Sequence, residues 1–416
     1  MNNMPIACKR NRSKRQKNNT ISGMKVACTG VLLAAVISEA QPAKDANKFL
    51  GNITSRGQVR SDFGKYWNQI TGENEHKWAT VERSRDQMSW TGGDRVAAYA
   101  ETAGVPWKFH TLVWGSQFPT WITSLSQAEQ LAEIEEWFDA AKAKYPDLPM
   151  IDVVNEAHPN HAPAPFKNAL GGDGATGYDW IMKSFQMARA RWPKAILIYN
   201  DYNNMEYNNE VDWTVKMINT LVKAGAPIDA IGCQAHDTYK INTNTIKSNL
   251  DKLAATGLPI FVTEYDIGYS DDAQQLRSIQ DQFPVMWNHP SIVGVTYWGY
   301  IVGQTWRTGT GLMTDGGAER PALTWLVDYV KKNPSPANKY PDFLATGVTS
   351  ISDRAFSSSR SFLNQERELK IFDMQGKEIG SFLGDKNSLV RSALLPSKGN
   401  YILHDGKSSQ VIRINR

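Results

Sequence analysis

The feature that most constrains the fold is a series of eight short apolar runs between residues 49 and 298. Amphipathic stretches separate them, and Gln127–Lys144 and Tyr178–Arg191 have helical spacing. Alternating strands and helices form parallel sheets, and eight repeats over about 285 residues favour an α/β fold of the (β/α)8 TIM-barrel type over an open sheet. The apolar runs are Phe49–Ile53, Gln69–Gly72, Trp107–Trp114, Met150–Asn155, Ile196–Asn200, Ala230–Gln234, Ile260–Glu264 and Val293–Trp298.

The chain of 416 residues has room for one barrel and a smaller domain. A Pro-rich segment indicates a linker, which we place at residues 333–352, after a barrel domain at residues 41–332. Residues 353–416 contain short alternating apolar runs separated by Gly-containing turns. This pattern predicts a small all-β C-terminal module.

The N-terminus has the pattern of a secretion signal over residues 1–40. Seven Lys or Arg residues accompany an apolar run from Val26 to Ile37, and Ser38 and Ala40 fit the −3 and −1 positions of a cleavage site. A run of about 12 residues is too short for a bilayer, which needs about 20, so we expect no membrane span in the mature chain. An uncleaved anchor or a basic tail is the alternative. The expected location is extracellular or at the cell surface, with the periplasm as the other destination.

Cysteine usage and charge exclude several classes of protein. Cleavage would leave Cys233 alone of three cysteines, so no disulfide could form within the mature chain. No Cys/His spacing indicates a structural metal site. The net charge of +4 belongs to the ends of the chain, because residues 41–350 carry a balance of −6. We therefore expect no nucleic-acid partner.

Tryptophan is concentrated in the middle of the chain. All 14 tryptophans lie between Trp67 and Trp325. Buried structure alone seldom needs so many, and indoles commonly stack on the flat apolar faces of ligands, including pyranose rings. This concentration favours a carbohydrate ligand.

The segments after the apolar runs are unusually polar. In a TIM barrel the carboxyl ends of the strands carry the active site. Amides and charged groups there would bond hydroxyls while indoles stack on sugar faces, which predicts a carbohydrate-binding cleft. The polar segments are Glu73–Trp78, Trp114–Gln117, Asn155–Glu156, Asn200–Asn203, Gln234–Asp237, Glu264–Asp266 and Trp298.

Two carboxylates among them have the pattern of a catalytic pair. Glu156 directly follows the fourth run and Glu264 ends the seventh, and these strands lie on opposite sides of an eight-stranded barrel. Glycoside hydrolysis needs one carboxyl group to protonate the leaving oxygen and another to attack or to activate water. The pair therefore predicts a glycosidase.

Five motifs occur in the order typical of glycoside hydrolase family 10, which the chain resembles over about residues 45–332. They are Thr71–Trp78, His110–Gln117, Asp152–Ala157, Asn200–Asn203 and Thr263–Ile267. Members of that family are mostly endo-β-1,4-xylanases. The resemblance implies a retaining two-step mechanism with Glu156 as acid/base and Glu264 as nucleophile.

The resemblance also assigns the remaining site residues. It implies that Asn155 bonds the 2-hydroxyl of the attacked sugar, that His236 and Asp266 keep the nucleophile ionised, and that Gln234 is a polar contact beside His236. Tyr202 matches the platform on the aglycone side, where the leaving part of the substrate binds. The glycone side binds the part that contains the attacked sugar, and its residues match Glu73, Asn74, Lys77, His110, Trp114, Gln117, Trp298 and Trp306.

Three positions depart from the family pattern. Gly115 stands where a second His is usual, His76 where Met is usual, and Tyr265 where Leu is common. We hypothesise that His76 refills the space left at Gly115 and that glycone-side selectivity is altered, with a decorated sugar admitted. Neither catalytic carboxylate is affected.

The resemblance leaves alternatives open. Xylan or xylo-oligosaccharides are the expected partners and no cofactor is expected, because carboxyl groups and water suffice. Another β-glycan, such as cellulose or mixed-linkage glucan, or a β-glycoside is the second substrate class, and a non-catalytic carbohydrate-binding protein is the third reading. The C-terminal module resembles those of secreted bacterial polysaccharidases. It would engage secretion machinery or a cell-surface partner, unless it is a stabilising module.

Overall fold

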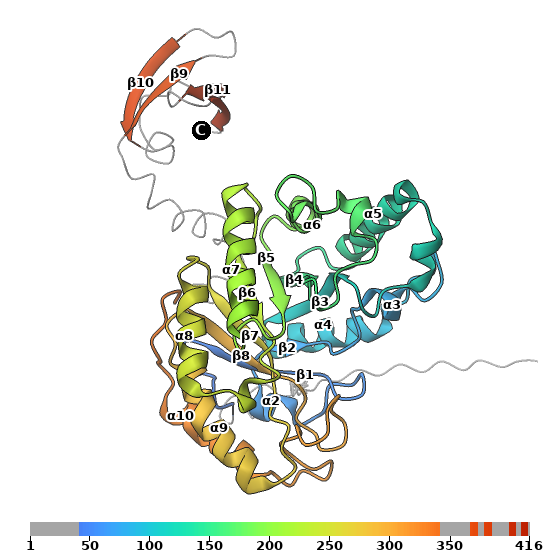
Figure 1. The fold of residues 1–416 in the computed structure, drawn as a ribbon, viewed down its shortest axis with the longest axis vertical. Coiled ribbons are helices and arrows are strands. Elements are labelled where there is room, and N and C mark those ends of the chain that lie inside the picture. The colour runs from blue at the N-terminus through green and yellow to red at the C-terminus, as the bar shows by residue number, and fades with distance from the viewer. Residues whose placement is uncertain (1–40, 342–366, 373–377, 385–398, 405–408, 415–416) are drawn as a thin grey trace, which may run out of the picture.

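The computed structural model describes residues 41–341 and four strands between residues 367 and 414. Eight parallel strands close into a barrel in the order of the sequence, so the TIM-barrel prediction is confirmed (Figure 1). The barrel strands are β1 (Phe49–Ile53), β2 (Ile70–Thr71), β3 (Trp107–Trp114), β4 (Met150–Asn155), β5 (Ile196–Asp201), β6 (Ala230–Cys233), β7 (Ile260–Tyr265) and β8 (Ile292–Tyr297).

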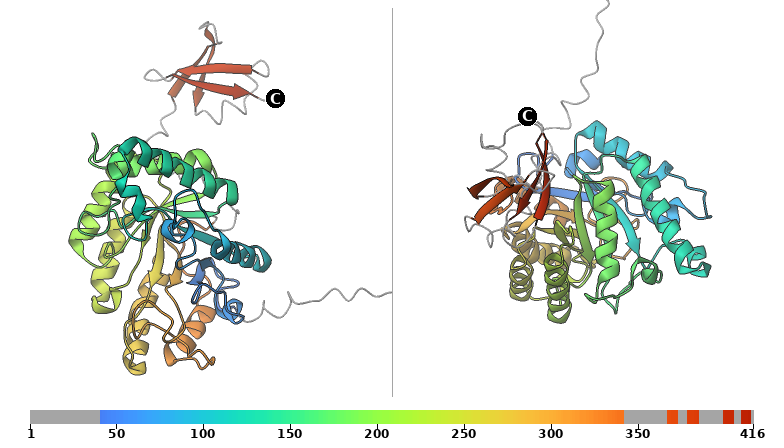
Figure 2. Two further views of the ribbon diagram at one scale, coloured as in Figure 1. Left: turned by 90° about the vertical axis from the view of Figure 1, so that its right-hand side faces the viewer. Right: turned by 90° about the horizontal axis from the view of Figure 1, so that it is seen from above.

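The helices lie outside the strands and cover the barrel (Figure 2). The predicted helix Gln127–Lys144 is observed with those bounds, and Ser126 and Glu129 form a capping box at its start. The other predicted helix begins one residue late because Tyr178 is its N-cap. The α-helices are α2 (Phe63–Tyr66), α3 (Trp78–Val81), α4 (Thr91–Ala103), α5 (Gln127–Lys144), α6 (Asp179–Arg191), α7 (Asn208–Lys223), α8 (Thr243–Ala254), α9 (Asp272–Trp287) and α10 (Pro321–Lys332).

Two apolar layers hold the barrel together. A small cluster that includes Phe49, Ile198 and Phe261 fills one part of the barrel, and a larger cluster lies between the strands and the helices. Parallel strands buried on both faces read as continuous apolar runs, which is why the runs predicted the strands. Strand β2 is shorter than expected, with pairing confined to Ile70 and Thr71.

Most tryptophans belong to this core. This corrects the expectation that buried structure alone would not account for their number. Eleven of the 14 are buried in the larger cluster or packed against it. Trp137 lies between the parallel rings of Trp78 and Trp90, at centroid distances of 5.6 and 5.4 Å. Abundant tryptophan in this chain is therefore mainly a packing feature.

Residues that follow the predicted barrel end at residue 332 contact the barrel. The backbone N–H of Asn47 donates to Pro334 O at 3.0 Å, and the Asn338 side chain donates to Asn47 O at 2.7 Å. Tyr340 packs against the cluster inside the barrel, and its hydroxyl donates to Gly257 O at 2.8 Å. Pro334, Asn338 and Tyr340, in the first part of the predicted linker, thus contact the barrel.

The four C-terminal strands form an antiparallel sheet in the order β10-β9-β11-β12. They are β9 (Arg367–Phe372), β10 (Glu378–Gly384), β11 (Gly399–His404) and β12 (Ser409–Ile414). The predicted signal at residues 1–40 and the linker residues 342–352 lie outside the described residues. Within the described part of the chain, no helix combines the length and apolar character needed to cross a membrane.

Candidate active site

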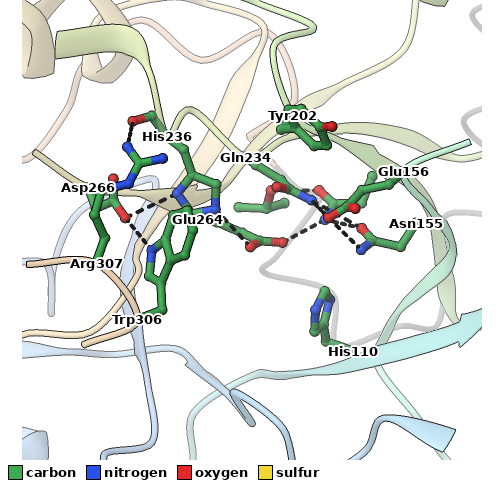
Figure 3. Close-up of polar contacts among 12 residues, drawn as sticks. His110, Asn155, Glu156, Tyr202, Gln234, His236, Glu264, Asp266, Trp306 and Arg307 are labelled. Carbon is green, nitrogen blue, oxygen red and sulfur yellow. Dashed lines mark hydrogen bonds and ion pairs between the residues drawn. The ribbon is translucent and has the colours of Figure 1, made fainter. Parts of the chain in front are cut away.

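A cavity of about 530 Å³ opens among the segments that follow the barrel strands. Thirteen of the fifteen predicted site residues line it. Of the other two, Asn155 donates to the lining residue Glu156, and Asp266 is hydrogen-bonded to the lining residues His236 and Trp306 (Figure 3). The lining residues are Glu73, Asn74, Lys77, His110, Trp114, Gln117, Glu156, Tyr202, Asn203, Gln234, His236, Asp237, Glu264, Trp298, Trp306 and Arg307.

Glu156 and Glu264 are joined by a short chain of amide hydrogen bonds. Asn200 at the end of β5 donates its Nδ2 to Glu264 Oε1 and to Asn155 Oδ1, both at 2.8 Å. Gln234 donates its Nε2 to Glu156 Oε1 at 3.0 Å. Amides from three strand ends therefore hold both carboxylates at one cavity.

The surroundings of Glu156 favour its protonated form. Burial raises the pKa of this carboxyl above its ordinary value, and the charge of Glu264 adds to the rise, against hydrogen bonds from Gln234 and Trp114. Trp114 Nε1 donates to Glu156 Oε2 at 2.9 Å. The backbone of Glu156 has φ of 56°, in the left-handed region that non-glycine residues seldom adopt. Such strain costs of order 1–3 kcal/mol and is typical of functional positions.

The surroundings of Glu264 favour the opposite state. Burial opposes ionisation, but the hydrogen bond from His236 and the charges nearby outweigh it and lower the pKa of Glu264 to about 2. His236 Nε2 lies 3.3 Å from Glu264 Oε2, and its Nδ1 lies 3.1 Å from Asp266 Oδ2. Burial lowers the pKa of His236, but Asp266 and Glu264 raise it to about 10, so the ring is cationic at neutral pH. The two carboxyl groups thus differ in protonation because their neighbours differ.

One wall of the cavity is a polar network around Lys77. Its ammonium group donates to Asn74 Oδ1 at 2.9 Å and to Gln117 Oε1 at 2.7 Å, and lies 5.0 Å from the centre of a Trp114 ring. Burial lowers the pKa of Lys77 and raises that of Glu73 to about 7. This wall offers several hydroxyl-binding groups at fixed positions.

The cavity-lining residue His110 is held by Asp152, a buried residue that does not line the cavity. Its Nδ1 lies 2.8 Å from Asp152 Oδ2, which also accepts from Lys108 at 2.5 Å. Burial lowers the pKa of His110, against the hydrogen bond with Asp152. The other ring edge is left to face the cavity, in line with its place in the lining.

Three further aromatic side chains, Trp298, Trp306 and Tyr202, line the cavity. Trp298 is buried, whereas Trp306 is 51% exposed and donates its Nε1 to Asp266 Oδ2 at 2.7 Å. Tyr202 stacks on His161, with ring centroids 3.6 Å apart. Flat apolar faces next to carboxylates and amides fit sugar rings better than ions.

The sequence analysis missed four residues of the site. Asn200 and Asn203 belong to a segment already identified as polar, so their motif could have revealed them. Asp237 follows His236 directly. Arg307 carried no signal, because it comes from the loop after β8; its guanidinium donates to His236 O at 3.0 Å and covers Trp306.

The prediction that His76 refills the space at Gly115 is wrong, while the predicted change in glycone-side selectivity stays a prediction. A Cβ on Gly115 would lie 2.3 Å from Pro163 O and 2.4 Å from Ala162 O, so backbone already fills this space. His76 is fully buried and packs against Trp107, and it does not line the cavity. The family pattern identified Gly115 and His76 as unusual residues, but it could not show that the backbone of Ala162 and Pro163 fills the space beside Gly115.

The comparisons with known proteins agree with this geometry. A model of glycosyl hydrolase family 10 matches residues 34–329. Endo-1,4-beta-xylanase B of Cellvibrio japonicus (strain Ueda107) is 47% identical over 285 residues, which are 68% of this chain and 46% of that protein. This chain thus spans about half the length of that relative.

Solved structures show the same barrel. Xylanase 10B from Thermotoga maritima has a TM-score of 0.62 and 26% identity, over 70% of this chain and 97% of its own. Xylanase 10B from Thermotoga petrophila RKU-1, solved with xylobiose, has the same TM-score and identity, over 70% and 96%. With its barrel, its ordered motifs and the matched family model, the chain belongs to glycosyl hydrolase family 10.

Proposed function

We propose that this chain is an endo-acting β-1,4-xylanase that cleaves xylan with retention of configuration. The observation that carries the proposal is the pair of carboxyl groups in one cavity with opposite pKa shifts, upward for Glu156 and downward to about 2 for Glu264. Retaining glycosidases need one protonated and one ionised carboxyl group at the start of the reaction. The named relatives, which are xylanases, support the choice of substrate.

In the first step Glu264 attacks the anomeric carbon while Glu156 donates its proton to the leaving glycosidic oxygen. The sugar is then bound covalently to Glu264, and the charge of this carboxylate is lost. Glu156, now ionised, takes a proton from water as the water attacks the same carbon and restores Glu264. Burial of both groups strengthens these electrostatic effects.

The other predicted residues receive supporting roles in this proposal. Asn155 would bond the 2-hydroxyl of the attacked sugar, with its Oδ1 already held by Asn200 so that its Nδ2 is oriented. His236, held by Asp266, would keep Glu264 ionised. The network of Lys77 would bind sugar hydroxyls on the glycone side, and Tyr202 would support the leaving part on the aglycone side.

Replacement of Glu264 by Ala or Gln tests the mechanism. Each variant should lose about 10⁴-fold or more in kcat on xylan, because it lacks the carboxylate that forms the covalent intermediate. Reducing-sugar release measures the loss, and anomeric analysis by NMR tests retention with the wild type. Full activity in Glu264→Ala would exclude this mechanism.

Product analysis on glucuronoxylan, arabinoxylan and carboxymethylcellulose tests the substrate. We expect xylo-oligosaccharides from both xylans and little release from the cellulose derivative. Faster cleavage of a glucan would favour the second substrate class instead. Binding of xylan without cleavage would favour a carbohydrate-binding protein.

We further propose that residues 1–40 direct export and that the C-terminal strands belong to a module for sorting or attachment. The basic and then apolar pattern of the N-terminus supports the first part. Fractionation of cells expressing the full chain tests both: the enzyme should leave the cytoplasm, and deletion of residues 353–416 should change its final location without loss of activity. Equal distribution of both forms would leave the module with a stabilising role.

A further inference from the structure

Three side chains of the kind that bind metals converge beside the active site. His158 and His161 lie on the loop after β4, and Glu210 lies in the first turn of α7. Nε2 of His158 is 3.0 Å from Glu210 Oε2, and Nε2 of His161 is 3.6 Å from the same atom. All three offer ligand atoms within 4.8 Å of one another.

These spacings fit a tetrahedral ion. Zinc binds His nitrogen at about 2.0–2.1 Å and carboxylate oxygen at about 2.0–2.2 Å. In a tetrahedron with such bonds, neighbouring ligand atoms lie about 3.3–3.5 Å apart. The observed 3.0 and 3.6 Å lie on either side of that value, so small side-chain shifts would complete the geometry.

Glu210 has an unsatisfied oxygen at this point. Its Oε2 is buried and makes no hydrogen bond, although two ring nitrogens lie close to it. The side chain is only 11% exposed. A buried carboxylate oxygen that accepts no hydrogen bond is costly, and a bound cation would remove that cost.

Nδ1 of His161, the ring nitrogen that would not bind the metal, already contacts a carboxylate, as it does in many metal sites. His161 Nδ1 lies 2.6 Å from Asp201 Oδ1, so a carboxylate orients the ring and leaves Nε2 with its lone pair toward Glu210. Carboxylate–histidine–metal chains have this arrangement. His158 Nδ1 accepts a 3.3 Å bond from the Asn160 amide, a contact that would be given up when the ring proton moves to Nδ1.

We propose that His158, His161 and Glu210 form a binding site for one divalent transition-metal ion of the zinc type, with water as the fourth ligand. Two imidazoles and one carboxylate suit zinc rather than calcium, which prefers all-oxygen ligands. The site is independent of the catalytic carboxylates, so the proposal does not rest on the proposed function. A second cluster, Glu82, Asp86 and Glu133, is less suited because Arg85 already pairs with Glu133.

The ion would connect the β4 loop to α7 directly under the aglycone platform. His161 stacks on Tyr202, which lines the active-site cavity, while His158 contacts Trp213, which lines a neighbouring cavity of about 500 Å³. Ligation would fix the His161 ring and with it the plane of Tyr202. Metal loading should therefore affect binding of the leaving part of the substrate more than the chemistry at Glu264.

Metal binding by the full untagged chain tests the proposal. After chelator treatment and dialysis, equilibrium dialysis against micromolar Zn²⁺ should give one ion per chain, and Co²⁺ should give the visible absorption of a four-coordinate site with imidazole ligands. Zn²⁺ should raise Tm in proportion to the logarithm of its concentration above Kd, and Ca²⁺ should not. Absence of Zn²⁺ uptake by the folded wild type would overturn the proposal.

Two variants locate the ion. His158→Gln and Glu210→Gln should each abolish stoichiometric Zn²⁺ uptake and the Zn²⁺-dependent rise in Tm. His289→Gln is the matched control, since His289 is also buried and paired with a carboxylate, at 3.2 Å from Asp251, away from the cluster. Uptake that persists in both variants, or is lost equally in the control, would show that the ion binds elsewhere and would overturn the assignment.

Discussion

The ionisation of Glu264 depends on His236 more than on any other hydrogen-bond donor of this carboxylate. Replacement by Gln keeps an N–H group but removes the positive charge, while burial continues to oppose ionisation. The pKa of Glu264 should therefore rise from about 2, and the acidic limb of kcat/KM should move to higher pH, because Glu264 must be ionised to attack. The pH profile of His236→Gln on an aryl xylobioside measures this. An unmoved acidic limb would contradict the assigned role.

Trp114 also lowers the pKa of its carboxyl group, but at Glu156 this effect opposes the net shift, which is upward. Its N–H bonds the ionised form of Glu156 and so lowers the pKa of that group against the effect of burial. Trp114→Phe keeps an apolar ring but removes this bond, so the pKa of Glu156 should rise further and the basic limb should move to higher pH. The same assay measures both limbs, and an acidic limb that stays in place serves as the internal control. A basic limb that moves to lower pH would refute this reading.

At the scale of elements, the loop after β4 fills the space beside Gly115. The Gly115 amide donates to Ala162 O at 2.9 Å, and no Cβ fits there unless the loop moves. Gly115→Ala should destabilise the fold by about 1–3 kcal/mol, as overpacking does. Thermal unfolding measures this, with Gly316→Ala as a control because its Cβ would meet one atom, at 4.0 Å. A Tm equal to that of the wild type would show that the loop yields freely.

Comparison of the observed strands and loops with the sequence patterns shows which of them could be predicted. Strands and their polar ends were predictable, because buried parallel strands are continuous apolar runs and their carboxyl ends meet at one edge. The course of the 157–166 loop was not, since it depends on contacts such as Gly115 with Ala162. Arg307 was missed for a related reason: a long loop after β8 brings it over Trp306, and no local pattern records that contact. The number of tryptophans could not distinguish core packing from sugar stacking, because both use the same side chain.

For the whole molecule, the two ends of the barrel domain are held against each other. Residues 333–341 contribute the bond from Asn47 Nδ2 to Pro336 O at 2.8 Å, that from Lys339 N to Pro290 O at 2.7 Å, and the packing of Tyr340 against the inner cluster. A barrel that ends at residue 332 would lose these contacts and expose part of the inner cluster.

A fragment of residues 41–332 should therefore be less stable than one of residues 41–341. The lost hydrogen bonds contribute about 0.5–1.5 kcal/mol each, and the half-buried Tyr340 side chain adds about 1 kcal/mol of apolar burial. In a domain larger than 200 residues each kcal/mol lowers Tm by about 2–4 °C, so the difference should be several degrees. Both fragments should keep the kcat of the full chain at temperatures below unfolding, since these contacts lie away from the active-site cavity. Equal Tm values would place the end of the folding unit at residue 332, where the Pro-rich pattern first indicated it.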